Sequence, residues 1–223
     1  MVFQRISGLA ALGAGVTYII GFWFYFSILG PAQYGAANVP AAQHVQFLID
    51  HQAMMISWNL VIYVLNAILM VLIVLGVHER IRAGAARLAQ TAAAFGLIWA
   101  GFILAAGMVF NVGVARIVAL NAHDPSAAEN LWHAVVAIGS GLGGGNEITG
   151  GLWIFLLSIA GWGSRSISRA TSALGLLIGA AGLVSTIPAL AEAAIVFGLG
   201  FILWFFAIGA ELIRTPAQPQ PDA

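Results

Sequence analysis

The sequence predicts an all-α protein, a polytopic transmembrane bundle of six helices with both termini on the cytoplasmic side. Three observations predict this fold class. Hydrophobic residues make up 61% of the 223 residues and charged residues only 7%, whereas a soluble domain carries about 25% charged residues. Six segments are apolar over roughly the 20 residues that a bilayer span requires. The chain contains no lysine, and seven of its eight arginines fall in alternate gaps between these segments.

The arginine pattern sets the expected orientation, because cytoplasmic loops of membrane proteins collect basic residues. Only Arg116 lies in a gap of the opposite set. The arginines of the first set are Arg5, Arg80, Arg82, Arg87, Arg165, Arg169 and Arg214. We therefore expect an N-in, C-in protein, multi-pass in a bacterial inner (plasma) membrane.

The six predicted spans belong to one domain over residues 1–214, followed by a Pro-rich tail, 215–223, that we expect to be disordered. The first apolar stretch has roughly 24 residues, longer than the 7–15 of a signal-peptide core, so it is expected to remain as a span. The spans are expected at about 6–29, 57–77, 89–112, a fourth ending near Trp162, 171–187 and 189–213.

Two connections on the outer side carry helix-start signals, a proline at Pro40 and the pair Asp124-Pro125, with Asp124 as N-cap. A helix running unbroken over 40–77 would be about 57 Å long, against a hydrocarbon core of about 30 Å. It must therefore project, tilt or break. A helix from Pro125 to Trp162 has the same difficulty, and the glycines between 139 and 145 are the expected break.

Composition also limits the expected partners and chemistry. The chain has no cysteine, which excludes disulfides, thiol catalysis and thiolate-bound metal. Its net charge is zero, and its few basic residues are spread over short loops, so no nucleic-acid partner is expected. Membrane lipids are the expected partners, and a homodimer or a larger membrane complex is possible. The sequence requires no cofactor.

Glu147 is the residue most suggestive of function. It lies inside the fourth span, about 22 Å above the cytoplasmic boundary at the helical rise per residue. An ionisable group at that depth is costly and usually faces a partner or a wet cavity. Two interpretations stay open: a site for a proton, a cation or another ligand, or a hydrogen-bonded carboxyl group that holds helices together.

Other polar residues reach a similar depth and could form one pocket with Glu147. In the second span, Asn59, Tyr63 and Asn66 share a helical face. The alternative is a set of separate interhelical hydrogen bonds, each worth roughly 1 kcal/mol. The aromatic run Phe22–Phe26 is interpreted as an interface belt instead. The candidate ligand-binding residues are Glu147, Asn146, Asn66, Tyr63, Asn59, Tyr18, Ser185 and Thr186.

Histidines and carboxylates gather on the predicted outer side, where they could bind zinc or another divalent metal. The candidate ligands are His51, His123, Glu129 and His133. Their spacing matches no established metal motif, so solvated or interfacial side chains are the alternative.

The layout resembles a bacterial family of six-span integral membrane proteins classed as a domain of unknown function. The likeness rests on Arg5-Ile-Ser-Gly-Leu entering the first span, a long first outer loop, and a Gly-rich fourth span. That span ends in the short basic loop from Gly163 to Arg169. The resemblance implies fold and topology only and assigns no catalytic residue.

The function favoured by the sequence is binding or transport of a small molecule, lipid or ion through an outward-facing polar pocket centred on Glu147. Two alternatives of other classes remain. One is a membrane-embedded enzyme that uses outer-side histidines and carboxylates on a lipid-like substrate. The other is an accessory or assembly subunit of a membrane complex.

Overall fold

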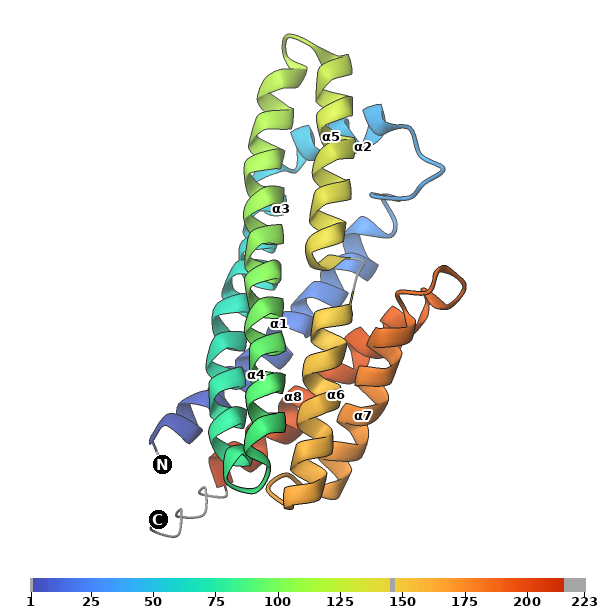
Figure 1. Ribbon diagram of the computed structural model, residues 1–223. Helices are drawn as coiled ribbons and strands as arrows, with labels where there is room; N and C mark the ends of the chain where they lie inside the picture. The colour runs from blue at the N-terminus through green and yellow to red at the C-terminus, as the bar shows by residue number, and fades with distance from the viewer. Residues whose placement is uncertain (1, 145–146, 215–223) are drawn as a thin grey trace.

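The computed structural model describes residues 2–144 and 147–214 (Figure 1). All regular structure in these ranges is helical. Asn146 and the tail 215–223 lie outside the described residues. In chain order the elements are α1 (Val2–Phe24), η1 (Tyr25–Leu29), α2 (Ala41–Asp50), α3 (Gln52–Asn59), η2 (Leu60–Leu65), α4 (Asn66–Asn121), α5 (Pro125–Gly139), η3 (Ser140–Gly144), α6 (Ile148–Ser164), α7 (Arg169–Val184), η4 (Pro188–Leu190) and α8 (Ala193–Arg214).

Three continuous helical stretches are long and apolar enough to cross a membrane: Val2–Leu29, Gln52–Asn121 and Ala193–Arg214. Two shorter apolar helices, α6 and α7, accompany them. The 70-residue stretch is two helices rather than one. At Ala85 the backbone leaves helical geometry, with φ −153° and ψ 54°, and Figure 1 shows the chain reversing direction there. This turn falls inside the segment predicted to connect the second and third spans.

The segments 40–77 and 125–162, each too long to cross a bilayer as one helix, are both interrupted. His51, with φ −126° and ψ 23°, separates α2 from α3. The glycine-rich segment separates α5 from α6, as predicted, because α6 begins only at Ile148. The predicted N-cap is confirmed, since the Asp124 carboxylate accepts a hydrogen bond of 3.0 Å from the backbone N–H of Ala127. Pro40 lies one residue earlier than predicted, at the N-cap of α2.

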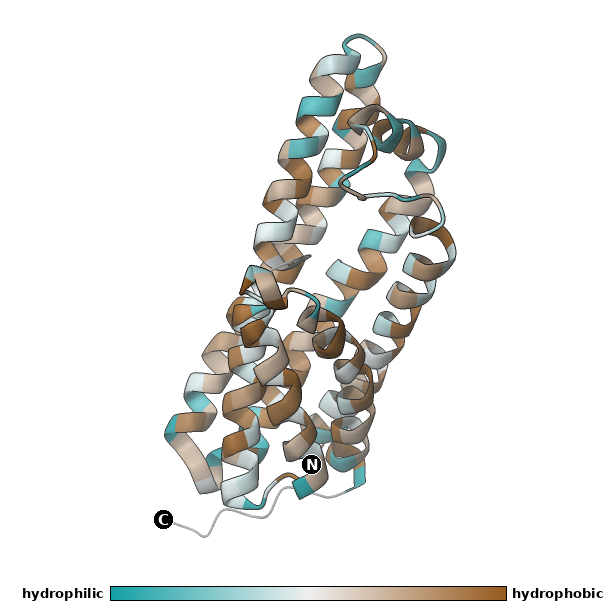
Figure 2. Cartoon of the chain, turned by 90° about the vertical axis from the view of Figure 1, so that its right-hand side faces the viewer, coloured by the Kyte–Doolittle hydropathy of each residue, from teal (hydrophilic) through white to brown (hydrophobic). Residues whose placement is uncertain are grey.

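The described residues form two cores, and each defines a region of the molecule. The lower bundle consists of α1, α6, α7, α8 and the part of α4 that packs against them, around Trp99, Trp153, Phe201 and Trp204. The upper cap consists of α2, α5 and the part of α4 near Ile117, around Trp132 and neighbouring apolar residues. Figure 2 shows polar residues concentrated towards the two ends of the molecule.

Both described chain ends, Val2 and Arg214, lie at the lower end of the molecule (Figure 1). Hydrogen bonds between separate segments close this end. The guanidinium Nε of Arg80 donates to the backbone oxygen of Ser166 at 2.7 Å. The carboxylate of Glu211 accepts from the backbone N–H of Ser168 at 3.1 Å and from the hydroxyl of Thr171 at 2.5 Å. These residues therefore join loops and helix ends to one another.

Candidate functional site

Three helices lose regular α geometry where the lower bundle meets the upper cap. The segments η1, η2 and η3 are π-helical, and π segments within α-helices occur frequently at functional sites. All three contribute residues to two neighbouring cavities: Tyr25 from η1 and Tyr63 from η2 line both, and Ser140 from η3 lines the upper one. Each irregular segment therefore contributes to the wall of at least one cavity.

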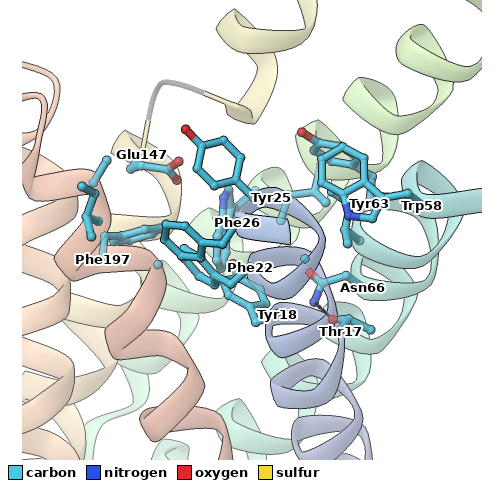
Figure 3. Close-up of a pocket in the computed structure, with 17 residues that line it drawn as sticks. Thr17, Tyr18, Phe22, Tyr25, Phe26, Trp58, Tyr63, Asn66, Glu147 and Phe197 are labelled. Carbon is cyan, nitrogen blue, oxygen red and sulfur yellow. Dashed lines mark hydrogen bonds between the residues drawn. The ribbon is translucent and has the colours of Figure 1, made fainter. Parts of the chain in front are cut away.

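The first cavity, here the Glu147 cavity, has a volume of about 570 Å³ (Figure 3). It brings together four of the candidate residues predicted from the sequence, Tyr18, Tyr63, Asn66 and Glu147. Its other lining residues are Thr17, Gly21, Phe22, Tyr25, Phe26, Trp58, Ile62, Trp99, Ile103, Ala194, Ile195, Phe197 and Gly198. Residues from both ends of the chain therefore meet around this cavity.

Glu147 occupies the N-cap position of α6, with φ −97° and ψ 20°. A carboxylate is favoured there by the partial positive charge of the helix N-terminus. Its side chain makes no capping hydrogen bond, and in Figure 3 the carboxylate turns into the cavity, towards Tyr25. Among the described residues that line the cavity there is no arginine or histidine. The carboxylate therefore faces the cavity without a cationic side chain to balance it.

Asn66 forms part of the cavity wall through a hydrogen bond between helices. Its Nδ2 donates to Thr17 Oγ1 at 2.8 Å, and the Thr17 hydroxyl donates to the backbone oxygen of Ala14 at 2.8 Å. Asn66 and Thr17 are both buried. This bond fixes α1 against the start of α4 below the cavity. Thr17 was not predicted from the sequence, although a threonine inside the first span was a visible signal.

Eight of the seventeen described lining residues are aromatic. They are Tyr18, Phe22, Tyr25, Phe26, Trp58, Tyr63, Trp99 and Phe197. The interpretation of residues 22–26 as an interface belt was therefore incomplete: Trp23 is exposed, as a belt residue would be, whereas three of its neighbours line the cavity. The indole N–H groups of Trp58 and Trp99 are buried without a hydrogen-bond partner in the described structure.

A second cavity of about 620 Å³ lies on the upper-cap side and shares Tyr25, Trp58 and Tyr63 with the first. Asn59, another predicted candidate, lines this upper cavity rather than the Glu147 cavity. Tyr34 also lines it and accepts a hydrogen bond of 3.4 Å from the indole N–H of Trp132. Burial raises the pKa of Tyr34 above its usual value. Three shared aromatic side chains thus separate the two spaces.

The remaining candidates are not brought to the Glu147 cavity. The hydroxyl of Ser185 donates to the backbone oxygen of Gly182, and that of Thr186 to the backbone oxygen of Leu183, each at 2.8 Å. Both bonds run from residues just after α7 back to its last turn. Asn146 lies outside the described residues, so its predicted role stays a prediction.

The candidate metal ligands do not converge in the described part of the chain, where no group of three His, Asp or Glu side chains could hold a metal ion. His51 stacks on Phe47, with ring centroids 4.4 Å apart, and its Nδ1 lies 3.0 Å from the Phe47 backbone oxygen. His133 packs edge-on against Trp132. His123 and Glu129 take part in no such group.

No family model, curated protein or solved structure matches this chain. The resemblance to a bacterial six-span family of unknown function therefore stays a prediction.

Proposed function

We propose that this protein is a six-span integral membrane protein of a bacterial inner membrane that binds a small molecule in the Glu147 cavity. The termini and the lower end lie in the cytoplasm, and the upper cap lies outside. The ligand exchanges with the outer side through the upper cavity or the adjoining outer leaflet. The observation that carries this proposal is the Glu147 carboxylate, which has no cationic partner among the described residues lining its cavity. It is directed into an aromatic-lined space where three helices become irregular.

The orientation is supported by the arginines together with the fold. Arg80, Arg82 and Arg87 flank the turn at Ala85, and Arg165 and Arg169 flank the α6–α7 connection. Figure 1 shows both connections at the lower end, beside the described chain ends. Basic residues collect in cytoplasmic loops, so the lower end is the cytoplasmic one.

The chemistry of Glu147 supports a ligand site over a purely structural carboxyl group. A carboxyl group that joins helices would use hydrogen bonds to do so, since buried polar groups in native structures are nearly always paired. The interhelical hydrogen bond at this level is instead made by Asn66 and Thr17. Ionisable residues at membrane depth that face a cavity commonly mark ligand or ion sites.

The geometry also supports exchange on the outer side. Below the cavity, Trp153, Phe201 and Trp204 are fully buried and pack ring against ring, and the wall residue Trp99 packs on Phe201. Above it, the upper cavity shares three aromatic side chains with the Glu147 cavity. These three shared side chains therefore stand between a bound molecule and the upper cavity, whereas a packed core lies beneath it. Transport across the membrane would require this lower core to rearrange.

The proposal is tested by asking what the protein carries when it is purified in native lipid. Native mass spectrometry should show a bound small molecule on the wild type and its loss from Glu147→Gln, which removes the charge but keeps the shape. Glu192→Gln is the matched control, because Glu192 is exposed and does not line the cavity. The same bound molecules on all three proteins would contradict the proposed site.

The topology is tested separately, and the cysteine-free chain allows single cysteines to be introduced without further changes. Ser126 is exposed at the top of α5, and Ala83 is exposed beside the turn at the lower end. A membrane-impermeant thiol reagent added to intact cells should label Ser126→Cys but not Ala83→Cys. The reverse pattern would invert the proposed orientation.

A further inference from the structure

We propose that the Glu147 cavity binds a monovalent organic cation, an ammonium compound with an apolar body, with the Glu147 carboxylate as its counter-ion and the aromatic rings as its cage. This inference rests on the proposed function and specifies the ligand class of the same site. It combines three observations: the charge of the cavity, the composition of its walls and its size.

The charge of the cavity selects a cation. Glu147 is the only acidic side chain among the described lining residues, and no basic side chain accompanies it. A carboxylate removed from water without a partner is strongly disfavoured. A ligand with a positive charge would supply that partner, whereas an anion would meet repulsion and a neutral lipid would leave the charge unbalanced.

The walls select an organic cation. Eight of the lining residues are aromatic, and the face of an aromatic ring attracts a cation placed within about 6 Å of its centroid. The rings are held in place by one another: Phe22 stacks on Phe26 at 6.2 Å, and Tyr25 meets the same Phe26 edge-on at 5.4 Å. Trp99 and Phe197, which also line the cavity, meet edge-on at 5.8 Å.

The size and ligand count argue against a bare metal ion. A divalent cation such as Ca²⁺ takes six to eight oxygen ligands, and the described lining residues offer a single carboxylate. Its volume of about 570 Å³ also lies within the range of roughly 300–1,000 Å³ that is typical of sites for small organic molecules. A quaternary or tertiary ammonium group with an apolar substituent fits both the charge and the volume.

The mouth of the cavity fits the same ligand class. Tyr25 and Phe26 of η1 and Ile195 near the start of α8 line the cavity and are also more than half exposed. Figure 1 places the α7–α8 turn at about the height of the break before α6, so this mouth lies beside the outer end of the bundle. An amphiphilic cation held at the outer membrane interface can enter there with its apolar body leading.

The experiment compares two ions of nearly identical shape and opposite charge, tetraphenylphosphonium and tetraphenylborate. Binding to purified protein is measured by equilibrium dialysis, with protein-free detergent micelles as the blank. We expect saturable binding of tetraphenylphosphonium to the wild type and none of tetraphenylborate. Glu147→Gln should weaken the binding at least about tenfold, which corresponds to roughly 1.4 kcal/mol. The control Glu192→Gln should bind as the wild type does.

Two further variants keep the test meaningful if Glu147→Gln folds poorly. Glu147→Asp keeps the charge and should retain most of the affinity. Tyr25→Leu removes an exposed ring from the mouth and should weaken tetraphenylphosphonium binding about two- to fivefold, the range of a partly exposed cation–π contact. Unchanged binding in both Glu147→Gln and Tyr25→Leu would overturn the proposal.

The outcomes separate this inference from the proposed function. Equal binding of both ions to the wild type, or no binding of tetraphenylphosphonium, rejects the cation as the ligand class. In either case the proposed function stands if a neutral or anionic small molecule co-purifies with the wild type and is lost from Glu147→Gln. If no small molecule depends on Glu147 in either experiment, both proposals fail.

Discussion

The lower bundle and its junction with the upper cap differ in how regular their helices are. In the lower bundle, α6, α7 and α8 are continuous. At the junction with the cap, η1, η2 and η3 replace regular α-helix, and α6 begins only at Ile148, after Glu147. Backbone in lipid must satisfy its own hydrogen bonds, and irregular backbone is tolerated where it borders protein or a wet cavity. The contrast therefore supports the junction as the proposed binding region.

Close backbone contact is the other mark of the lower bundle. A Cβ atom added at Gly8 would lie 2.9 Å from the backbone oxygen of Gly209, and one added at Gly209 would lie 2.9 Å from that of Gly8. Small residues at such crossings let membrane helices pack by van der Waals contact. The lower bundle is thus held by direct contact of α1 with α8, whereas the junction above it encloses two cavities.

The largest expected effect comes from emptying the lower core. Phe201 is fully buried and contacts the rings of Trp99, Trp153 and Trp204. Phe201→Ala should destabilise the protein by about 3 kcal/mol, at the lower end of the range for buried phenylalanine. The value is at the lower end because moving a phenylalanine side chain from lipid into the core yields packing contacts but no hydrophobic transfer energy. The thermal unfolding midpoint in detergent measures this. Leu203→Ala, at a 64% exposed position of the same helix, should change the midpoint little, and equal shifts would refute the packed lower core.

A smaller effect is expected from separating α1 and α8. Gly209→Ala forces the Gly8 backbone away and should cost about 1–3 kcal/mol, the usual range for overpacking. Gly101→Ala is the matched control, because a Cβ at Gly101 meets nothing within 4 Å. It should be neutral or slightly stabilising, since alanine favours helix over glycine. If both variants unfold at the wild-type midpoint, the reciprocal glycine contact is not a determinant of stability.

A destabilising substitution in the upper cap should affect the stability of that region and leave the lower bundle unchanged. Asp124→Ala removes the N-cap bond to Ala127 and should weaken α5 by about 1 kcal/mol. Faster amide hydrogen exchange at the start of α5, with unchanged exchange in α7 and α8, would show that the cap opens independently. Ser126→Ala, an exposed neighbour, serves as the control. Uniformly faster exchange throughout the chain would mean that the two regions unfold as one unit.

The smallest effect concerns pH at the lower end. Burial lowers the pKa of His78, and nearby Arg82 adds to this. Because the unfolded imidazole then binds a proton more readily than the folded one, stability should be constant above a pH of about 6.5 and fall modestly as the pH drops below it. His78→Gln should remove this part of the decline. The same decline in His78→Gln and the wild type would assign it to other groups.

Sequence reasoning located the helix break in the glycine run because a 38-residue helix cannot fit the bilayer, and it identified Asp124 because N-capping is a local property. It gathered Tyr18, Tyr63, Asn66 and Glu147 from their depth and, for Tyr63 and Asn66, from the helical face that they share. It misplaced Ser185 and Thr186, since hydroxyls near helix ends often bond to their own backbone. The aromatic wall was missed because belt and cavity residues have the same composition, and π segments carry no sequence signal.

The proposed cavity opens to the outer side above a closed lower core. Ile62 of η2 lines the Glu147 cavity, whereas Ile73, further along in α4, is fully buried in the lower core. Single cysteines at these positions can be probed in sealed right-side-out vesicles with a membrane-impermeant thiol reagent. We expect Ile62→Cys to react from outside and Ile73→Cys to stay unreacted. An inert Ile62→Cys beside a reactive Ser126→Cys would contradict the proposed outward opening.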